Sequence, residues 1–265
     1  MRNILAEYPD YSAEIEAIKN GALSADEGID VTLLYRIINK HKYNAAYNRK
    51  LYNRYKANEN GVPIFSRQPR FDSKEINNKI NNDFFGEIID FKVGYFAGEP
   101  IGYSYSVTQE SVDDTGGESA VDSASKALTD FVTRNNMYDV DMEVTKFAAI
   151  CGYAGRLFYI DPEGDERCIA VKPFECIVLT DVEVTEPMYA VRYYRTKDIH
   201  DKTVWKVEFY DSTNIYFYEG TLGNLTFVKK QPHMFTYCPL QLIPNNREIS
   251  RIVAMSFCEP RSWEL

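Results

Sequence analysis

The sequence predicts an α+β fold, in which N-terminal helices and one long apolar helix pack on a mainly antiparallel sheet. Up to Gly155, apolar residues recur every three or four positions, the period of an amphipathic helix. From Arg156 onward, short alternating segments are separated by turn residues at hairpin spacing. With 265 residues, 45% of them hydrophobic, the chain is long enough for one large or two small domains. We expect a helical segment at 1–57, an α+β domain at 58–249 and an atypical tail at 250–265.

The N-terminal segment predicts one short helix between Tyr8 and Gly28. Ile15 and Ile18 lie on one side of this helix, and Gly21 follows its end. We expect the segment to be only weakly held by the rest of the fold.

A longer, basic helix follows, capped by Asp30 and extending to about Ala57. Its apolar residues fall near one face: Leu33, Ile37, Tyr47, Leu51 and Tyr55. The stretch 31–58 contains no acidic residue and these basic ones: Arg36, Lys40, Lys42, Arg49, Lys50, Arg54 and Lys56. One hypothesis is a nucleic-acid-binding module, since cations neutralise phosphates and aromatic rings stack on bases; its candidate contacts are Arg49, Lys50 and Arg54. The alternative, which we favour, is a solvated basic face over a buried stripe.

The strongest helical pattern lies in the next part of the chain. One stripe recurs at steps of three or four residues: Ile76, Ile80, Phe84, Ile88, Phe91 and Tyr95. Three further apolar residues widen it: Phe85, Ile89 and Phe96. We expect this stripe to be buried, so that truncating Phe84 or Phe91 would cost about 3 to 5 kcal/mol.

Capping residues predict the bounds of this helix. Asp72 and Glu75 have the spacing of a capping box at its start. Gly98 suits a left-handed helix end, and Pro100 cannot continue a helix. Apolar residues at alternate positions then predict a strand over 101–107.

The middle of the chain predicts a loop followed by two helices. Gln109–Ser125 is acidic and rich in Gly and Ser, with few apolar residues, and it predicts an exposed, mobile loop. Helical spacing resumes at Leu128 and predicts a pair of helices joined at Asn135–Asn136. Asp139 or Asp141 can cap the second helix.

The last third predicts an antiparallel meander. Its first hairpin turns at Asp161–Gly164. The predicted strands are Arg156–Ile160, Arg167–Val171, Cys176–Leu179, Met188–Thr196, Thr203–Tyr210, Asn214–Tyr218 and Leu225–Lys229.

No constellation of residues predicts an enzyme, a metal site or a cofactor. The acidic residues at 161–166 allow a hydrolase hypothesis, with one carboxylate as acid and another as base, but acids are ordinary in a hairpin turn. His41, His200 and His233 are widely separated, and we expect each on the surface or in a turn. The cysteines are odd in number and not closely paired, which predicts free buried thiols: Cys151, Cys168, Cys176, Cys238 and Cys258.

Neither a membrane span nor a secretion signal is predicted. No stretch approaches the ~20 apolar residues that a spanning helix needs, and the first twenty or so residues carry acidic side chains where a signal peptide is apolar. We expect the protein to stay in the cytosol of the cell that makes it, with no membrane partner.

Three short motifs carry a resemblance to a known family. They are Lys92-x-Gly94-Tyr95 near the end of the apolar helix, Gly98-x-Pro100-Ile101-x-Tyr103 after it, and Pro244-Asn245-Asn246-Arg247-Glu248 after the last strand. The sequence resembles the portal proteins of tailed bacteriophages, in the branch common in long-tailed phages and prophages of Gram-positive bacteria. The resemblance covers roughly 51–248 and implies the fold of a portal wing domain. It marks as signature residues Lys92, Gly94, Tyr95, Gly98, Pro100, Asn245 and Asn246.

This resemblance implies a structural role. Portal subunits form a ring, usually of twelve copies, at one capsid vertex, where DNA is packaged and later ejected. The implied partners are other portal subunits, the terminase, capsid or scaffold proteins, head-tail adaptors and the DNA in the channel. The implied location is the host cytoplasm during assembly and the virion afterwards. The family's stem, clip and crown have no counterpart after Glu248, so we expect a truncated gene or a frameshift just after Ile249.

Overall fold

The computed structural model describes residues 8–24, 28–58, 62–65, 78–105, 117–180, 187–197 and 201–245. The helices are α1 (Ser12–Ala17), a π-helical turn η1 (Ile18–Ala22), α2 (Val31–Tyr55), α3 (Phe84–Ala97), α4 (Gly117–Arg134) and α5 (Met137–Cys151). The strands are β1 (Leu23–Ser24), β2 (Gly28–Ile29), β3 (Tyr153–Ile160), β4 (Glu166–Val171), β5 (Cys176–Thr180), β6 (Pro187–Lys197), β7 (Thr203–Tyr210), β8 (Asn214–Thr221), β9 (Asn224–Pro232) and β10 (Leu240–Pro244). The predicted α+β class is confirmed.

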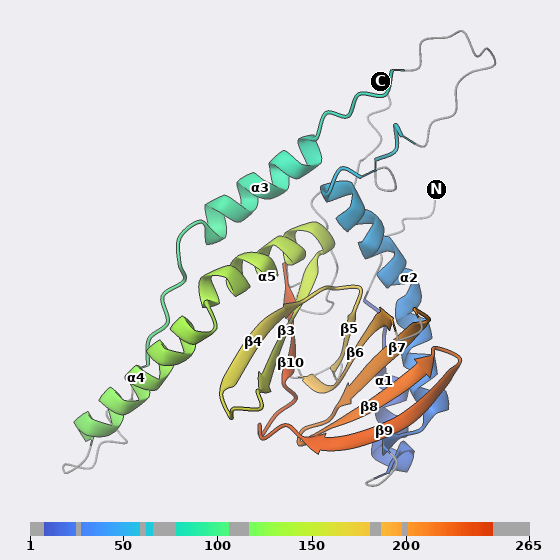
Figure 1. Cartoon of the computed structure of the whole chain (residues 1–265), viewed down its shortest axis with the longest axis vertical. Coiled ribbons are helices and arrows are strands. Elements are labelled where there is room, and N and C mark those ends of the chain that lie inside the picture. Colours follow the sequence, from blue (N-terminus) through green and yellow to red (C-terminus); the bar gives the residue numbers. More distant parts are fainter. Residues whose placement is uncertain are drawn as a thin grey trace.

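The larger sheet is a meander of five strands in the order β5-β6-β7-β8-β9, with every neighbouring pair antiparallel. Sequence neighbours are therefore also sheet neighbours, as the hairpin spacing predicted. Helices α1 and α2 lie against this sheet (Figure 1). Leu34 and Ile37 of α2 are fully buried with Ile177, Val207 and Phe209 of the strands.

A smaller sheet has the order β10-β3-β4. The predicted hairpin β3–β4 is confirmed, but its outer neighbour β10 was not predicted. Leu240 of β10 pairs with Leu157 of β3 and is fully buried. Helix α5 covers this sheet, with Val144 and Phe147 packed beside Ala154 of β3. Helix α3 lies along α5 on the side away from the larger sheet (Figure 1).

Helix α3 is shorter than the sequence predicted. It begins at Phe84, where Asp83 caps it by accepting a hydrogen bond from the backbone N–H of Gly86 at 3.1 Å. Residues 78–83 are not helical, and Asp72 and Glu75 of the predicted capping box lie outside the described residues. Because Asp83 caps the helix, Ile80 lies before the helix start and is not part of α3.

The end of α3 also differs from the prediction. Gly98 caps the helix with φ −70° and ψ −20°, which is right-handed helical backbone rather than the left-handed end expected. A Cβ placed on Gly98 would overlap the carbonyl oxygen of Gly94, and this close approach accounts for the glycine. Residues 101–105 form no strand; within this segment Tyr103 is bonded to α5 instead, as described below.

The predicted acidic loop is partly wrong. Residues 117–125 form the first half of α4, which projects away from both sheets in Figure 1, and 109–116 lie outside the described residues. The helical pair is confirmed, but α5 begins after Asn136, which takes a left-handed conformation with φ 44°, and not at a cap from Asp139 or Asp141. Gly152, with φ 89°, ends α5.

The N-terminal segment is held more firmly than predicted. Tyr11, Ile15 and Ile18 are each 3% exposed and belong to the core of the larger sheet. Within the part of the chain that the structure describes, no helix combines the length and the apolar character needed to cross a membrane.

Candidate interaction site

Helix α3 presents two apolar faces, and the fold uses only one of them. Phe85, Ile89 and Val93 recur every four residues and pack against Ala149 and Ile150 of α5. A second side, which we call the outer face of α3, carries Phe84, Ile88, Phe91 and Tyr95, and Phe96 near the end of the helix is exposed as well. The predicted burial of this stripe is wrong, because the stripe that touches α5 is the neighbouring one.

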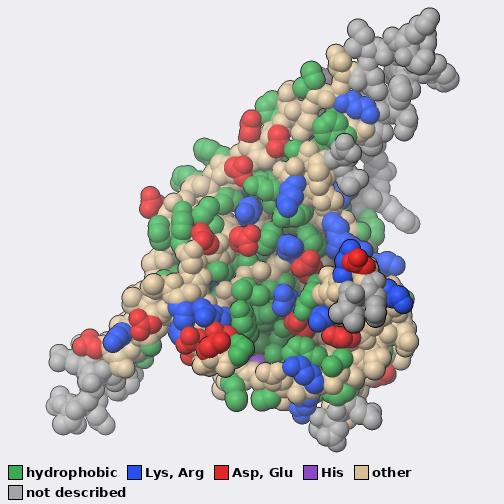
Figure 2. Space-filling view, viewed as in Figure 1, with side chains coloured by type: hydrophobic (Ala, Val, Ile, Leu, Met, Phe, Trp, Pro, Cys, Tyr) green, Lys and Arg blue, Asp and Glu red, His purple; other side chains and the backbone are tan. Residues whose placement is uncertain are grey.

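The outer face is a large apolar surface. Phe91 is 78% exposed and Tyr95 88% exposed, and Figure 2 shows hydrophobic side chains along the margin of the molecule where α3 lies. The segment after α3 extends it with Ile101, Tyr103 and Tyr105, which are also exposed. Large exposed apolar patches on soluble proteins occur at contacts with other molecules, so the outer face is a candidate for such a contact.

Two signature residues that lie far apart in the sequence meet beside this helix. The Lys92 ammonium donates to the side-chain oxygen of Asn245 at 2.9 Å, across 153 positions of sequence. The Asn245 backbone N–H donates to the carbonyl oxygen of Gly152 at 2.8 Å. This contact joins α3, the end of α5 and the end of β10. Asn246 lies outside the described residues.

The other signature residues are exposed. A Cβ on Gly94 would meet nothing within 4 Å among the described residues, so packing inside the subunit does not require this glycine. Pro100 and Tyr95 also face solvent. Of the signature set, the fold accounts for Lys92, Gly98 and Asn245.

The segment that follows α3 is tied to α5 by polar contacts. Tyr138 donates to the carbonyl oxygen of Gly98 at 3.1 Å, and Tyr103 donates to the Asp141 carboxylate at 2.6 Å. Asp141 is 3% exposed and also pairs with Arg156. Burial, followed by the bond to Asp141, raises the pKa of Tyr103 to about 12, so the phenol stays a proton donor. The sequence carries no sign of this group, because its members come from three separate elements.

The basic residues of α2 have varied surroundings. Arg36 and Lys40 pair with Glu14 of α1 at 2.9 and 2.7 Å, and Glu14 is only 1% exposed. Two of the predicted solvated cations are therefore paired with one buried carboxylate.

The three candidate nucleic-acid contacts on α2 do not share one environment. The Arg49 guanidinium lies over the ring of Phe174 at 4.9 Å, whereas the Arg54 guanidinium lies over Phe85 of α3 at 5.2 Å. Lys50 is exposed.

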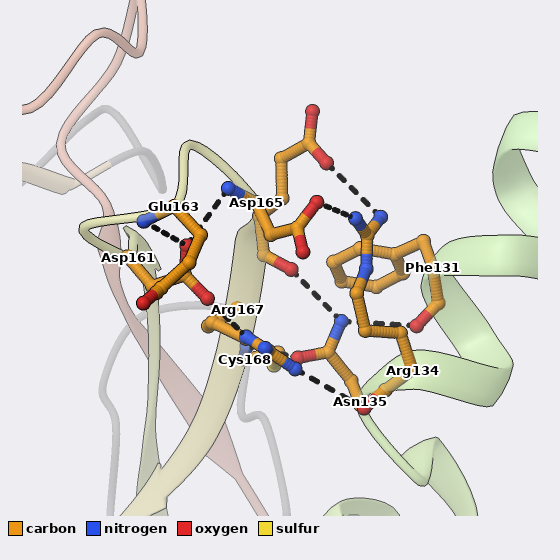
Figure 3. Close-up of polar contacts among 9 residues, drawn as sticks. Phe131, Arg134, Asn135, Asp161, Glu163, Asp165, Arg167 and Cys168 are labelled. Atoms are coloured by element: carbon orange, nitrogen blue, oxygen red, sulfur yellow. Dashed lines mark hydrogen bonds and ion pairs between the residues drawn. The ribbon is translucent and has the colours of Figure 1, made fainter.

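The acidic hairpin turn is occupied by structural contacts, which Figure 3 shows. The Asp161 carboxylate accepts hydrogen bonds from the backbone N–H groups of Glu163 and Asp165 and from Arg167, at 3.1, 2.9 and 2.7 Å. Arg134, at the end of α4, pairs with Asp165 and Glu166. The bond from Arg167 lowers the pKa of Asp161, whereas a general acid needs a pKa near the working pH. This geometry fits a docked hairpin and does not favour hydrolysis.

The described cysteines are free and buried, as predicted: Cys151, Cys168, Cys176 and Cys238; Cys258 lies outside the described residues. Burial raises the pKa of Cys176 to about 12, which disfavours the reactive thiolate.

The prediction of surface histidines is wrong at two positions. His41 is fully buried in a hydrogen-bonded contact with the hydroxyls of Tyr193 and Tyr153 at 2.7 and 3.0 Å. His233 is 3% exposed, beside the carbonyl oxygen of Asp211. Both are polar groups that the core satisfies, and His200 lies outside the described residues. Over the described ranges, no group of three or more His, Cys, Asp or Glu side chains could hold a metal ion.

Comparison with protein families decides the relationship of this chain. The model of the phage portal proteins of the SPP1 Gp6-like type matches residues 34–255, which is most of its length. The chain belongs to this portal family. The match starts inside α2 and includes α3 and the three-stranded and five-stranded sheets. Portal proteins are structural and not catalytic. None of the curated proteins compared with the chain matches it.

Proposed function

We propose that this portal-family chain is a structural subunit of the ring at one capsid vertex, through which phage DNA is packaged and ejected. In this proposal it is not an enzyme and needs no cofactor. Its partners are other portal subunits, with the terminase, capsid or scaffold proteins and head-tail adaptors as neighbours in the particle. It forms in the host cytoplasm and ends in the virion.

The outer face of α3 carries this proposal. A subunit of a ring must offer apolar surface to a neighbour, and that surface is exposed when the subunit is alone. Phe91, Tyr95 and Phe96 satisfy this description, and they lie within the signature segment of the family resemblance. A purely internal role for α3 would require only the face formed by Phe85, Ile89 and Val93.

The contacts beneath the outer face support the same role. Lys92 fixes α3 to Asn245, and the cluster of Phe85 and Ile89 with Ile150 fixes it to α5. A helix held at several points presents its exposed side chains in one arrangement, which lowers the entropy cost of binding.

Association of the 265-residue chain tests the proposal. The parent and a Phe91→Ser/Tyr95→Ser variant are compared by light scattering and sedimentation over a range of concentrations up to hundreds of micromolar. We expect the parent to self-associate and the variant to remain a monomer. Tyr43→Ser is the matched control, because Tyr43 is an exposed aromatic residue on α2. A parent that stays monomeric, or a Phe91/Tyr95 variant that associates like the parent, would contradict the role of the outer face.

A further inference from the structure

A hollow of about 350 Å³ lies between α2 and the larger sheet. Arg49 and Tyr52 of α2 form one wall, and Arg195 of β6 and Trp205 of β7 form the other. Its remaining lining residues are Asn53, Phe174, Glu175, Tyr193 and Tyr194. The volume is at the small end of the range typical of small-molecule sites, about 300 to 1,000 Å³.

Two arginines in this hollow lie over aromatic rings. The Arg49 guanidinium is 4.9 Å from the ring centre of Phe174, and the Arg195 guanidinium is 5.4 Å from that of Trp205. Among the described residues, neither arginine forms an ion pair with a carboxylate, in contrast to Arg134 and Arg156. A guanidinium stacked on a ring keeps its N–H edge for an anion.

The one acidic residue in the lining does not cancel these charges. Glu175 is half-buried, and its carboxylate lies 4.0 Å from the Lys172 ammonium. Two arginines against one glutamate leave the lining with an excess of one positive charge. The ammonium of Lys56, which is not itself part of the lining, lies over the ring of Tyr52 at 4.8 Å.

The rings around these cations are partly exposed. Tyr52 and Trp205 are each half-buried, while Phe174 and Tyr193 are buried. The ring of Tyr194 lies on the other face of β6, where its hydroxyl donates to Glu208. Trp205 lies 5.9 Å from Tyr193 with the ring planes 31° apart. Half-exposed rings beside cations favour a ligand that is both planar and anionic, because the exposed part of each ring and the N–H groups of the arginines then gain contacts.

We infer that this hollow binds a nucleotide unit, with the phosphate held by Arg49 and Arg195 and the base against the half-exposed rings. A carboxylate side chain would engage the arginines but would not use the exposed parts of Tyr52 and Trp205. An apolar ligand would bury two uncompensated cations. A DNA duplex is too wide for the hollow, so the unit is either a free nucleotide or one residue of a single strand. This inference does not depend on the portal role.

Tryptophan fluorescence provides a direct readout. The chain has two tryptophans, Trp205 and Trp263, so a Trp263→Phe background reports on the hollow alone. Thymidine monophosphate and a fluorescein-labelled oligothymidylate are titrated separately, following Trp205 quenching and fluorescein anisotropy. We expect both probes to bind and to quench Trp205. Similar affinities identify a free nucleotide as the ligand, and a strand bound more tightly by about tenfold or more identifies single-stranded nucleic acid.

Two variants and a matched control test the assignment of residues. We expect Arg49→Gln and Arg195→Gln each to weaken binding by about tenfold, the loss typical of one charge-assisted contact. Lys50→Gln removes the neighbouring charge on α2 outside the lining, and we expect less than about a twofold change. Circular dichroism and the melting midpoint check folding, and Arg195, which is exposed on β6, provides a second variant if Arg49→Gln unfolds.

Three results would overturn the inference. The first is no quenching of Trp205 by either probe at millimolar concentration. The second is an equal loss for Lys50→Gln and Arg49→Gln, which would mean a diffuse basic surface. The third is polyglutamate binding with the same dependence on Arg49 and Arg195, which would mean a site for any anion.

Discussion

At the scale of single residues, Glu14 shows how a buried charge can determine the role of surface cations. Its side chain is 1% exposed, whereas those of its partners Arg36 and Lys40 are 54% and 38% exposed. Removing the glutamate returns two cations to water. Removing the cations leaves a buried carboxylate with no opposite charge, which is far more costly.

We therefore predict unequal effects from the two sides of this ion pair. The Arg36→Met/Lys40→Met double variant should lose about 3 kcal/mol or more of unfolding free energy, and Glu14→Gln only about 1 kcal/mol. Urea denaturation at neutral pH measures both values. Lys42→Met, at an exposed position of the same helix, is the control and should change stability by no more than about 0.5 kcal/mol. Equal losses would show that the carboxylate is better solvated than its burial indicates.

His41 predicts an acid sensitivity. Burial lowers its pKa to about 3, from about 6.5 in an unfolded chain. Because the folded pKa is the lower one, the unfolded chain takes up a proton first as the pH falls. The contribution of neutral His41 is therefore complete above pH ~6.5 and is lost progressively between pH ~6.5 and pH ~3.

The expected loss from His41 is about 2 kcal/mol between pH 7.5 and pH 5. Urea midpoints at these two pH values measure it. His41→Gln keeps a donor and an acceptor for Tyr153 and Tyr193 but cannot titrate, so its unfolding free energy should fall by about 2 kcal/mol less than that of the parent over the same interval. Burial also lowers the pKa of His233. Because His233 is present in both proteins, its contribution to the pH dependence cancels in the comparison. Identical pH dependence in the two proteins would contradict a buried neutral His41.

At the scale of elements, α3 offers two adjacent phenylalanines in opposite environments. Phe85 is 6% exposed and packs against α5, and Phe84 is 63% exposed on the outer face. We predict that Phe85→Ala lowers the unfolding free energy by about 3 to 5 kcal/mol, and that Phe84→Ala changes it by no more than about 0.5 kcal/mol. Denaturant titration of the monomer at low concentration decides this. A larger loss of unfolding free energy for Phe84→Ala would mean that the stripe with Phe84 and Ile88 is the buried one, as the periodicity predicted.

The same helix shows what sequence could predict and what it could not. Apolar residues occupy most positions of α3, so a period of 3.6 fits the stripe with Phe84 and Ile88 as well as the stripe with Phe85 and Ile89. Periodicity predicts that a face of the helix is apolar. It does not state whether the subunit or a partner covers that face.

Other differences have similar causes. The first half of α4 was predicted as a loop because it has few apolar residues, but a projecting helix needs little burial, and Glu118, Ala120 and Ala124 are compatible with one. The strand β10 is only five residues long and depends on pairing with β3, a contact across more than eighty positions. The meander β5 to β9 was predictable because each strand pairs with its neighbour in sequence. The hollow could not be predicted from the sequence, since its walls come from α2, β6 and β7, which are far apart in the chain.

The contact between Lys92 and Asn245 can be measured as a coupling between elements. We predict that Lys92→Met and Asn245→Ala are non-additive, with a coupling free energy of about 1 kcal/mol or more, because the charge-assisted bond joins α3 to the end of β10. A double-mutant cycle in urea provides the value. The pair Tyr43→Ser and Asn245→Ala, whose first member is exposed on α2, should be additive. Coupling near zero would mean that Lys92 is held by its other surroundings.

At the scale of the whole molecule, charge and apolar surface oppose each other. The chain has a formal net charge of −9, so identical copies repel at neutral pH and low salt. In the proposed role the outer face of α3 favours contact between copies, and salt screens the repulsion without weakening apolar burial. The hollow between α2 and the larger sheet depends instead on attraction between arginines and a phosphate, which salt weakens.

The two proposals therefore predict opposite responses to salt. Raising NaCl from about 50 mM to about 500 mM shortens the screening length from roughly 14 Å to roughly 4 Å. We expect self-association through Phe91 and Tyr95 to strengthen, as light scattering would detect, and oligothymidylate binding at Arg49 and Arg195 to weaken, as anisotropy would detect. Phe91→Ser/Tyr95→Ser should abolish the salt-dependent self-association and leave oligothymidylate binding unchanged. Arg195→Gln should weaken oligothymidylate binding and leave self-association unchanged. If both responses had the same sign, or if either variant changed both, one surface would be serving both purposes and the separation of the two sites would be wrong.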